Sequence, residues 1–398
     1  MISLHHEVRK MHTVGIIAEY NPLHLGHIYQ INKTKELYKD SIIILITNST
    51  FTQRGEISIL NKWHKTRLSL ENNIDLIIEL PFAYATQSAD IFAKASLYIL
   101  NQLKIDTLIF GSESNNIEKL TNIVDTQLNN PKYDKLVRNY LNTGINYPTA
   151  MSKALFDILG YTITEPNDLL GISYIKEIKR NNYKINPVSI KRTNNYHSNQ
   201  LDTNIVNASL IRKMFYNNES IDKFLPSNTS KYLYQNLSNE SYFTYLKYKI
   251  ITTTDLSIYQ TVDEGIENRI KKAISHSNTW EELVQNIKTK RYTYNKINRM
   301  LIHILTNFTK EEAKNLKIDY IRILGFNEKG KKHLNKIKKY LEIPLITNYK
   351  PNISRLLDLE LRATSIYSLP LNNNLIELEY KQKPIIKNTS QNDNNQKD

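Results

Sequence analysis

One stretch decides the fold of this chain: Thr13-Val14-Gly15-Ile16-Ile17-Ala18-Glu19-Tyr20-Asn21-Pro22-Leu23-His24-Leu25-Gly26-His27. The apolar run at 14–18 predicts a strand, Asn21-Pro22 predicts a turn, and apolar positions 28, 31 and 38 predict a helix that begins near His24. A helix N-terminus carries unpaired N–H groups and a partial positive charge, so anions bind there. Since His24 and His27 can donate hydrogen bonds to an anion's oxygens, the stretch predicts a phosphate site.

The pattern His-x-Gly-His after a first strand resembles the signature of the nucleotidyltransferase α/β-phosphodiesterase superfamily. In that chemistry a nucleophile displaces pyrophosphate from the α-phosphate of ATP, and the protein positions the groups and stabilises developing charge. A glycine at position 26 would let the backbone approach the phosphate closely. The alternative is that the two histidines merely lie on the surface at a helix start, and the preceding strand and turn argue against it.

Strand and helix patterns alternate in the first half of the chain. Apolar runs at 41–47, 75–80 and 106–110 predict buried strands, and the patterns at 60–73 and 88–103 predict helices. This alternation predicts an α/β fold with right-handed crossovers and a Rossmann-like parallel sheet. Ligands in such sheets bind at the carboxyl ends of the strands, where the His24 region lies.

Several polar loops are expected at the same edge of the sheet. Gly111 ends the fourth predicted strand, where a glycine permits close passage of an adenine or ribose. A helix capped by Asn167 or Asp168 and a further strand at 184–190 follow, and another helix starts at Asn207. Three residues in these loops are candidates for phosphate or acetate contacts, although solvated side chains are the alternative: Arg54, Ser209 and Arg212.

The charge balance favours a polyanionic partner. The formal net charge is +14, which points to tRNA or another nucleic acid ahead of an acidic membrane surface. Part of the lysine excess can instead reflect an AT-rich genome. From about 220 onward the pattern is mainly helical, with a helix expected at 230–249 and a short strand at 320–324. Candidate tRNA contacts there, with a solvated helix face as the alternative, are Arg291, Arg299, Lys331 and Lys332.

Composition excludes several classes of protein. The chain has no cysteine, so disulfides, thiolate metal sites and a cysteine nucleophile are excluded, and we assign no metal-ligating residues. It has neither a signal-peptide core nor an apolar run of transmembrane length, so we expect a cytoplasmic protein that does not enter membranes. The expected organisation is an N-terminal extension (1–10), a nucleotide-binding domain (11–218), a mainly helical domain (219–378) and a disordered tail (379–398).

Beyond the superfamily, the chain resembles the bacterial tRNA(Met) cytidine acetate ligases over nearly its whole length. The resemblance rests on several strings of sequence: 19–27, Gln53-Arg54-Gly55-Glu56, Lys62-Trp63, 79–90, Phe110-Gly111-Ser112-Glu113-Ser114, 166–174, Lys191-Arg192, Tyr196-His197 and 362–367. Together these strings are far more specific than His-x-Gly-His alone.

The resemblance implies a reaction and a set of site residues. Members activate acetate with ATP to acetyl-adenylate, then acetylate N4 of the wobble cytidine in elongator tRNA(Met). ATP would be the co-substrate, with Mg²⁺ expected from phosphate chemistry. His24 and His27 would be catalytic, and the helical domain would bind the tRNA. The implied ATP site comprises Ile17, Ala18, Glu19, Tyr20, Asn21, Pro22, Leu23, His24, Leu25, Gly26, His27, Ile28, Tyr29, Gln30, Gly111, Asn167 and Arg192.

Three departures from the family pattern bear on this interpretation. The chain has Asn48-Ser49-Thr50 in place of Ser-Gly-Asn, Lys65 in place of an arginine, and Asn207 in place of a serine. These departures can alter the reaction rate and the choice of acyl substrate relative to the family. The alternatives to an acetate ligase are a different adenylyltransferase acting on a small molecule and a non-catalytic RNA-binding protein with a nucleotide fold.

Overall fold

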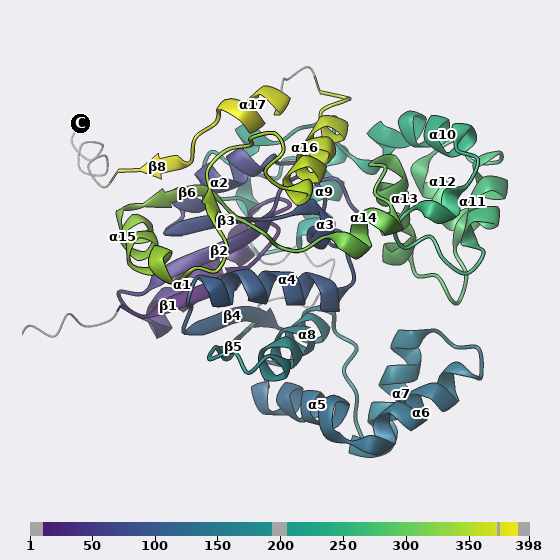
Figure 1. Ribbon diagram of the computed structural model, residues 1–398, viewed down its shortest axis with the longest axis horizontal. Helices are drawn as coiled ribbons and strands as arrows, with labels where there is room; N and C mark the ends of the chain where they lie inside the picture. The colour runs from purple at the N-terminus through teal and green to yellow at the C-terminus, as the bar shows by residue number, and fades with distance from the viewer. Residues whose placement is uncertain (1–10, 193–204, 372–374, 389–398) are drawn as a thin grey trace, which may run out of the picture.

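The expected parallel sheet forms the centre of the computed structural model, which describes residues 11–192, 205–371 and 375–388 (Figure 1). Its parallel strands are β1 (Thr13–Ile17), β2 (Ile42–Asn48), β3 (Leu76–Leu80), β4 (Thr107–Ser112) and β5 (Asn186–Lys191). They lie in the order β5-β4-β1-β2-β3. Every residue of β2 is buried, as a strand covered on both faces requires.

Helices cover both faces of this sheet, because alternate residues of each strand point to opposite sides. The crossover helices are α1 (Leu25–Leu37), α2 (Lys62–Glu71), α3 (Phe82–Ala85), α4 (Ala89–Gln102) and α8 (Pro166–Arg180). Ile42, Ile44 and Ile46 pack in one cluster with apolar residues of α4 and α8. Ile43 and Leu45 pack in another with residues of α1 and α2. Between β4 and α8 the chain forms α5 (Ile117–Asn129), α6 (Pro131–Leu141) and α7 (Tyr147–Leu159).

The second half of the chain returns to the sheet, which the sequence did not predict. β6 (Ile321–Asn327) pairs antiparallel with β3, and β7 (Leu345–Ile346) and β8 (Ile385–Lys387) pair with β6. The sheet is therefore mixed, and β6 covers what would otherwise be an open edge at β3. A boundary at 218/219 consequently does not separate a sheet domain from a helical one.

The helical region otherwise follows the prediction, with two corrections. The expected helix at 230–249 is wrong, because the chain forms η2 (Ser230–Tyr232), η3 (Asn239–Tyr242) and α10 (Phe243–Thr252) there. The expected disorder is wrong for 379–388, which hold the end of α17 (Leu375–Lys381) and β8, whereas 389–398 lie outside the described residues. The remaining elements are α9 (Ala208–Tyr216), η1 (Asp222–Phe224), η4 (Leu256–Ile258), α11 (Ile266–Ile274), α12 (Trp280–Ile287), α13 (Tyr294–Leu305), α14 (Lys310–Asn315), α15 (Glu328–Ile337), η5 (Lys338–Tyr340) and α16 (Arg355–Tyr367).

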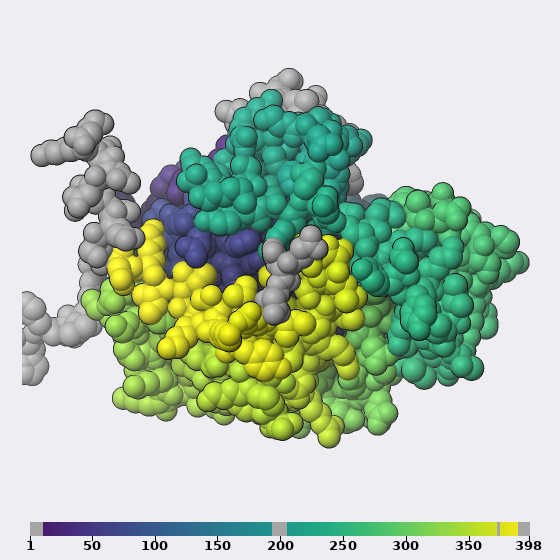
Figure 2. Space-filling view, turned by 90° about the horizontal axis from the view of Figure 1, so that it is seen from above, coloured from purple at the N-terminus to yellow at the C-terminus, as the bar shows by residue number. Residues whose placement is uncertain are grey.

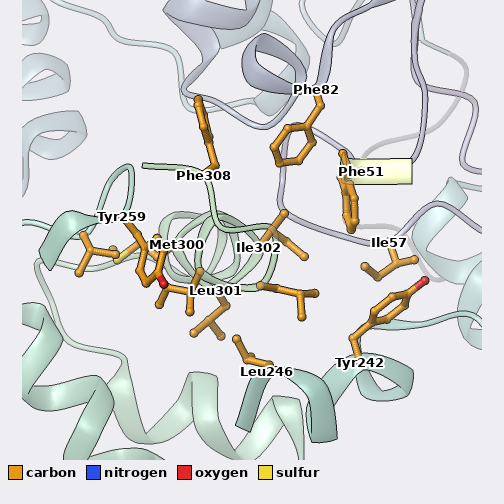
Figure 3. Packing of buried hydrophobic residues seen from close by; sticks show 14 of the residues in the cluster. Phe51, Ile57, Phe82, Tyr242, Leu246, Tyr259, Met300, Leu301, Ile302 and Phe308 are labelled. Carbon is orange, nitrogen blue, oxygen red and sulfur yellow. The ribbon is translucent and has the colours of Figure 1, made fainter. Parts of the chain in front are cut away.

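The helical region shares a hydrophobic core with loops of the sheet. Figure 3 shows Phe51 and Phe82, which follow β2 and β3, beside Ile302 and Phe308 of the helical region. The Phe51 and Phe82 rings lie edge to face with centroids 5.4 Å apart. Burial of these rings stabilises the fold, because it removes apolar area from water and places the rings in a favourable geometry. This packing fixes the helical region against the carboxyl ends of the strands.

A buried cluster of charges joins the C-terminal segments to the sheet. Lys62 Nζ lies 2.5 Å from Glu79 and 2.7 Å from Glu379, and Arg322 Nη1 lies 2.6 Å from Glu379. All four side chains are at most 2% exposed. They come from α2, β3, β6 and α17, and Figure 2 shows the yellow C-terminal segments lying against dark blue segments of the sheet region.

Within the described ranges, no helix combines the length and apolarity needed to cross a bilayer.

Candidate active site

The two histidines of the opening stretch cap the first helix. His24 is the N-cap of α1, and its Nδ1 accepts a hydrogen bond from the Gly26 N–H at 3.0 Å. His27 Nδ1 accepts from the His24 N–H at 3.2 Å, which completes a reciprocal capping box. The two rings lie 3.9 Å apart between centroids. The helix start predicted at this position is confirmed, and both imidazoles belong to it.

These hydrogen bonds fix where each imidazole carries its proton. A backbone N–H can only donate, so each Nδ1 must be an acceptor, and a neutral ring then carries its proton on Nε2. Burial and the nearby Arg192 and Arg212 lower the pKa of His24 to about 3. Burial, His24 and Arg192 lower the pKa of His27 well below its usual value. The site therefore presents two neutral imidazoles with Nε2–H donors.

Gly26 is required for a reason other than the one expected. A Cβ added at this position would lie 2.7 Å from Cε1 of the His24 ring. The glycine thus makes room for the capping histidine. The sequence predicts a close approach of the Gly26 backbone to phosphate, whereas within the chain the close contact at Gly26 is with the His24 ring.

A cavity of about 380 Å³ lies at the carboxyl ends of β1 and β4, where the strand order switches direction. Most of the predicted residues line it: Ile17, Ala18, Glu19, Tyr20, Asn21, His24, His27, Gln30, Arg54, Gly111, Asn167, Arg192, Ser209 and Arg212. Gly26 and Tyr29 line a smaller adjoining hollow that shares both histidines. Pro22, Leu23, Leu25 and Ile28 line neither space, and Leu23 instead belongs to the hydrophobic core.

Arg212 ties the late helix to the opening loop. Its Nη1 donates to the Asn21 carbonyl at 2.7 Å, and its Nη2 lies 2.6 Å from Glu56. Asn21 in turn accepts from the Ile59 N–H through its side chain at 2.9 Å. Arg212 thus lines the cavity and also fixes the loop that precedes His24.

The start of α8 differs from the prediction. Asn167 and Asp168 are not its N-cap, since the helix begins at Pro166 after Glu165. Glu113, from the loop after β4, accepts from Asn167 Nδ2 at 2.5 Å and from the Asp168 N–H at 3.1 Å. Glu113 also lies 3.8 Å from Arg192 Nε. A capping carboxylate 54 residues away is invisible to local sequence patterns.

The cavity also has an apolar wall that sequence reasoning missed. Its residues come from α4, β4 and α8: Ala89, Phe92, Phe110, Leu169, Leu170 and Tyr174. They occur within ordinary apolar helix and strand patterns, so no local signal distinguishes them from apolar residues that do not line the cavity. Such a wall beside three arginines can hold the apolar face of a base while its phosphates meet donors.

Comparison with known proteins shows to which family this chain belongs. Residues 11–383 match the model of the HIGH nucleotidyl transferase family. A tRNA(Met) cytidine acetate ligase of Clostridium novyi is 36% identical over 94% of this chain and 99% of its own. One of Anoxybacillus flavithermus is 35% identical over 94% of this chain and all of its own. The chain belongs to the tRNA(Met) cytidine acetate ligase family.

Solved structures agree with this membership. The chain is similar to the crystal structure of Thermotoga maritima TmcAL in its apo form, with a TM-score of 0.87 and 26% identity over 95% of this chain and all of the other. It is also similar to Thermotoga maritima TmcAL bound with alpha-thio ATP, with a TM-score of 0.84 and the same coverage. The HxGH nucleotidyltransferase fold predicted from the sequence is thus confirmed.

The departures from the acetate ligase family pattern have structural counterparts in the chain. Lys65 and Asn48 contact one another, with Lys65 Nζ 2.9 Å from Asn48 Oδ1, and both are buried. Asn207 is the N-cap of α9 and accepts from the Leu210 N–H at 2.8 Å. Since asparagine and serine cap helices about equally well, Asn207 can cap this helix as the family's usual serine would.

The four candidate tRNA contacts in this family member do not lie together. Arg291 is exposed and lies 3.1 Å from Glu264, whereas Arg299 donates to the Gln53 carbonyl at 3.2 Å. Burial lowers the pKa of Arg299 to about 10. Lys331 and Lys332 are exposed on α15, which begins beside the amino end of β3. The two lysines therefore lie near the amino ends of the parallel strands, whereas the cavity lies at their carboxyl ends.

Proposed function

We propose that this chain is an ATP-dependent acetate ligase that forms acetyl-adenylate and transfers the acetyl group to N4 of the wobble cytidine of elongator tRNA(Met). The observation that carries the proposal is the pair of neutral Nε2–H donors, His24 and His27, at a helix N-terminus inside a nucleotide-sized cavity. The names of its relatives and the ATP analogue bound by a similar structure support it.

In the first step an acetate oxygen attacks the α-phosphorus of ATP and pyrophosphate leaves. The imidazoles donate to the phosphate oxygens, on which negative charge accumulates in the transition state. Arg54, Arg192 and Arg212 line the same cavity and offset the charge of the triphosphate. A bound Mg²⁺ would neutralise phosphate charge mainly through phosphate and water oxygens, so this step needs no protein ligand to the ion.

In the second step the acetyl group passes to the tRNA, and AMP leaves. The net charge of +14 favours association with a polyanion. Arg291 is exposed on the loop before α13, and Asn295 at the start of that helix lines the cavity, so we expect Arg291 rather than Lys331 or Lys332 to meet the tRNA near the cavity. We expect the protein to act in the cytoplasm, where tRNA(Met) is found.

Mass spectrometry of tRNA nucleosides tests the proposal. Purified protein, ATP, isotopically labelled acetate and tRNA(Met) are expected to give labelled N4-acetylcytidine at the wobble position, and omission of ATP or acetate abolishes it. A failure to label the tRNA under conditions in which a relative succeeds would refute the acetate ligase. Pyrophosphate release that depends on another small molecule would favour a different adenylyltransferase, and an unmodified tRNA that still binds would favour a non-catalytic role.

A further inference from the structure

Glu19 belongs to the implied ATP site, but the adenylation step needs no acid or base from it. It follows β1 and lines the cavity together with His24 and His27. One carboxylate oxygen accepts a hydrogen bond from the Gln53 N–H at 2.7 Å. Among the described residues, no lysine, arginine or histidine nitrogen forms an ion pair with this carboxylate within 4.0 Å. Glu19 is thus anchored on one side and remains available to a ligand on the other.

The surroundings of Glu19 make its carboxylate basic. Burial raises its pKa to about 7, although the Gln53 hydrogen bond, Lys65 and Arg54 act in the opposite direction. Glu56 raises the pKa further, and Tyr174 on α8 also interacts with the charge of Glu19. A carboxylate with a pKa near the working pH can accept a proton and release it again.

Only the second step of the proposed reaction needs a base. Acetate attacks ATP as a carboxylate and carries no proton to lose. The exocyclic amine of cytidine must lose a proton when it forms an amide, since the product nitrogen bears one hydrogen instead of two. An amine that attacks without a base would leave a charged nitrogen on the tetrahedral intermediate.

We infer that Glu19 is the general base of the acetyl-transfer step, an inference that rests on the proposed function. The cytidine N4 attacks the carbonyl carbon of acetyl-adenylate, and a carbon–nitrogen bond forms. The bond between that carbon and the phosphate oxygen breaks, and AMP leaves with the electron pair. The N4 proton passes to the Glu19 carboxylate and is later released to water.

The two half-reactions, measured separately, test this inference. Acetate-dependent exchange of pyrophosphate into ATP reports adenylation, and single-turnover acetylation of tRNA(Met) by enzyme carrying acetyl-adenylate reports transfer. Glu19→Gln is expected to lower the ratio of transfer to exchange by about 100-fold or more, the usual worth of general base catalysis. Glu71→Gln, an exposed glutamate on α2, is the matched control and leaves the ratio unchanged.

The pH dependence of transfer gives a readout that a structural role would not move. In the wild type the transfer rate rises with pH through about 7, because the base must be deprotonated, and Glu19→Gln loses this rise. Lys65→Gln moves the rise to higher pH, since Lys65 lowers the pKa of Glu19. Glu19→Asp, a shorter carboxylate, regains part of the transfer rate and the pH dependence.

Each result decides the matter. An unchanged ratio in Glu19→Gln, or an equal loss in both half-reactions, overturns the assignment of Glu19 as the base. A rise with pH that survives Glu19→Gln overturns it as well. If the wild type forms no acetyl-adenylate or never acetylates the tRNA, the proposed function fails instead.

Discussion

At the scale of single residues, the capping box that joins His24 to His27 determines the chemistry of the site. Each Nδ1 is occupied by a backbone N–H, and this leaves Nε2 to face a ligand. The same donors, placed on flexible surface histidines, would lose entropy on binding and would titrate near neutral pH. Because the capping box already holds both neutral rings in place, they lose little entropy and stay uncharged when negative charge develops on the phosphate.

Both imidazoles are expected to stay neutral between pH 5 and 8 in the ligand-free protein, with the proton on Nε2. The physical reason is burial beside Arg192, which lowers the pKa of His24 to about 3 and that of His27 well below its usual value. Long-range proton–nitrogen correlation spectra report the tautomer and titration of each ring. A ring that titrates in this range, or carries its proton on Nδ1, would contradict the prediction.

Residues close in sequence were predictable, and residues close only in space were not. The turn, the helix start and the two histidines lie within fifteen residues, so periodicity and capping preferences identified them. Glu113 caps α8 from the loop after β4, and Tyr174 lines the cavity from the middle of a helix. Neither has a local signature, because each role depends on a packing contact between distant segments.

At the scale of elements, α15 docks unusually closely on the sheet. A Cβ added at Gly330 would lie 2.1 Å from the Asp75 carbonyl oxygen, which is backbone and cannot move aside. His333, one turn further along, lies 2.8 Å from the Leu103 carbonyl oxygen. The glycine therefore sets the distance between this helix and the start of β3.

Gly330→Ala is expected to reverse the usual helix preference. Alanine in a helix is normally more stable than glycine by about 0.5–1 kcal/mol, but here the clash should lower the free energy of unfolding by about 1–3 kcal/mol. Urea denaturation measures the change, and Lys329→Ala, the neighbouring position on the same helix, serves as control. A Gly330→Ala variant as stable as the wild type would show that the helix can shift at no cost.

The strands β1 to β4 were predictable because buried parallel strands are continuous apolar runs, a pattern that all four have. The strand expected at 320–324 is present as β6, but its partner and direction were not predictable. Pairing with β3 joins positions more than two hundred residues apart, and no local pattern encodes the choice of an antiparallel edge.

At the scale of the whole molecule, a cluster of buried charges joins α2 and β3 of the nucleotide-binding region to β6 and α17, which lie far along the chain. Lys62, Glu79, Arg322 and Glu379 are brought together from four elements and are almost completely excluded from water. Such a cluster is costly to desolvate, and it is much more costly to leave incomplete. It explains why residues 379–388 form the end of α17 and β8, although their polar composition predicts a disordered tail.

Glu379→Gln is expected to lower the free energy of unfolding by about 3–5 kcal/mol at pH 7, because Lys62 and Arg322 lose a buried partner. These two cations hold the pKa of Glu379 at about 2, below the ordinary value of 4.5 that applies in the unfolded chain. Its stabilisation is therefore complete above about pH 4.5 and is lost as the pH falls towards 2.

Guanidinium denaturation at several pH values measures this linkage. The difference in stability between wild type and Glu379→Gln should shrink between pH 5 and pH 3. Glu377→Gln, on the same helix but about half-exposed, should change stability by less than about 1 kcal/mol. A difference that stays constant down to pH 3 would show that the Glu379 charge does not stabilise the fold.

The proposed activity requires that the His24–His27 pair stabilise the displacement of pyrophosphate from ATP. Acetate-dependent exchange of labelled pyrophosphate into ATP, without tRNA, measures that step alone. We predict exchange in the wild type, a loss of about 10²–10³ in either His24→Ala or His27→Ala, and an unchanged rate in His276→Ala, whose side chain is exposed. Exchange that survives both substitutions, or a wild type that shows none, would contradict the claim.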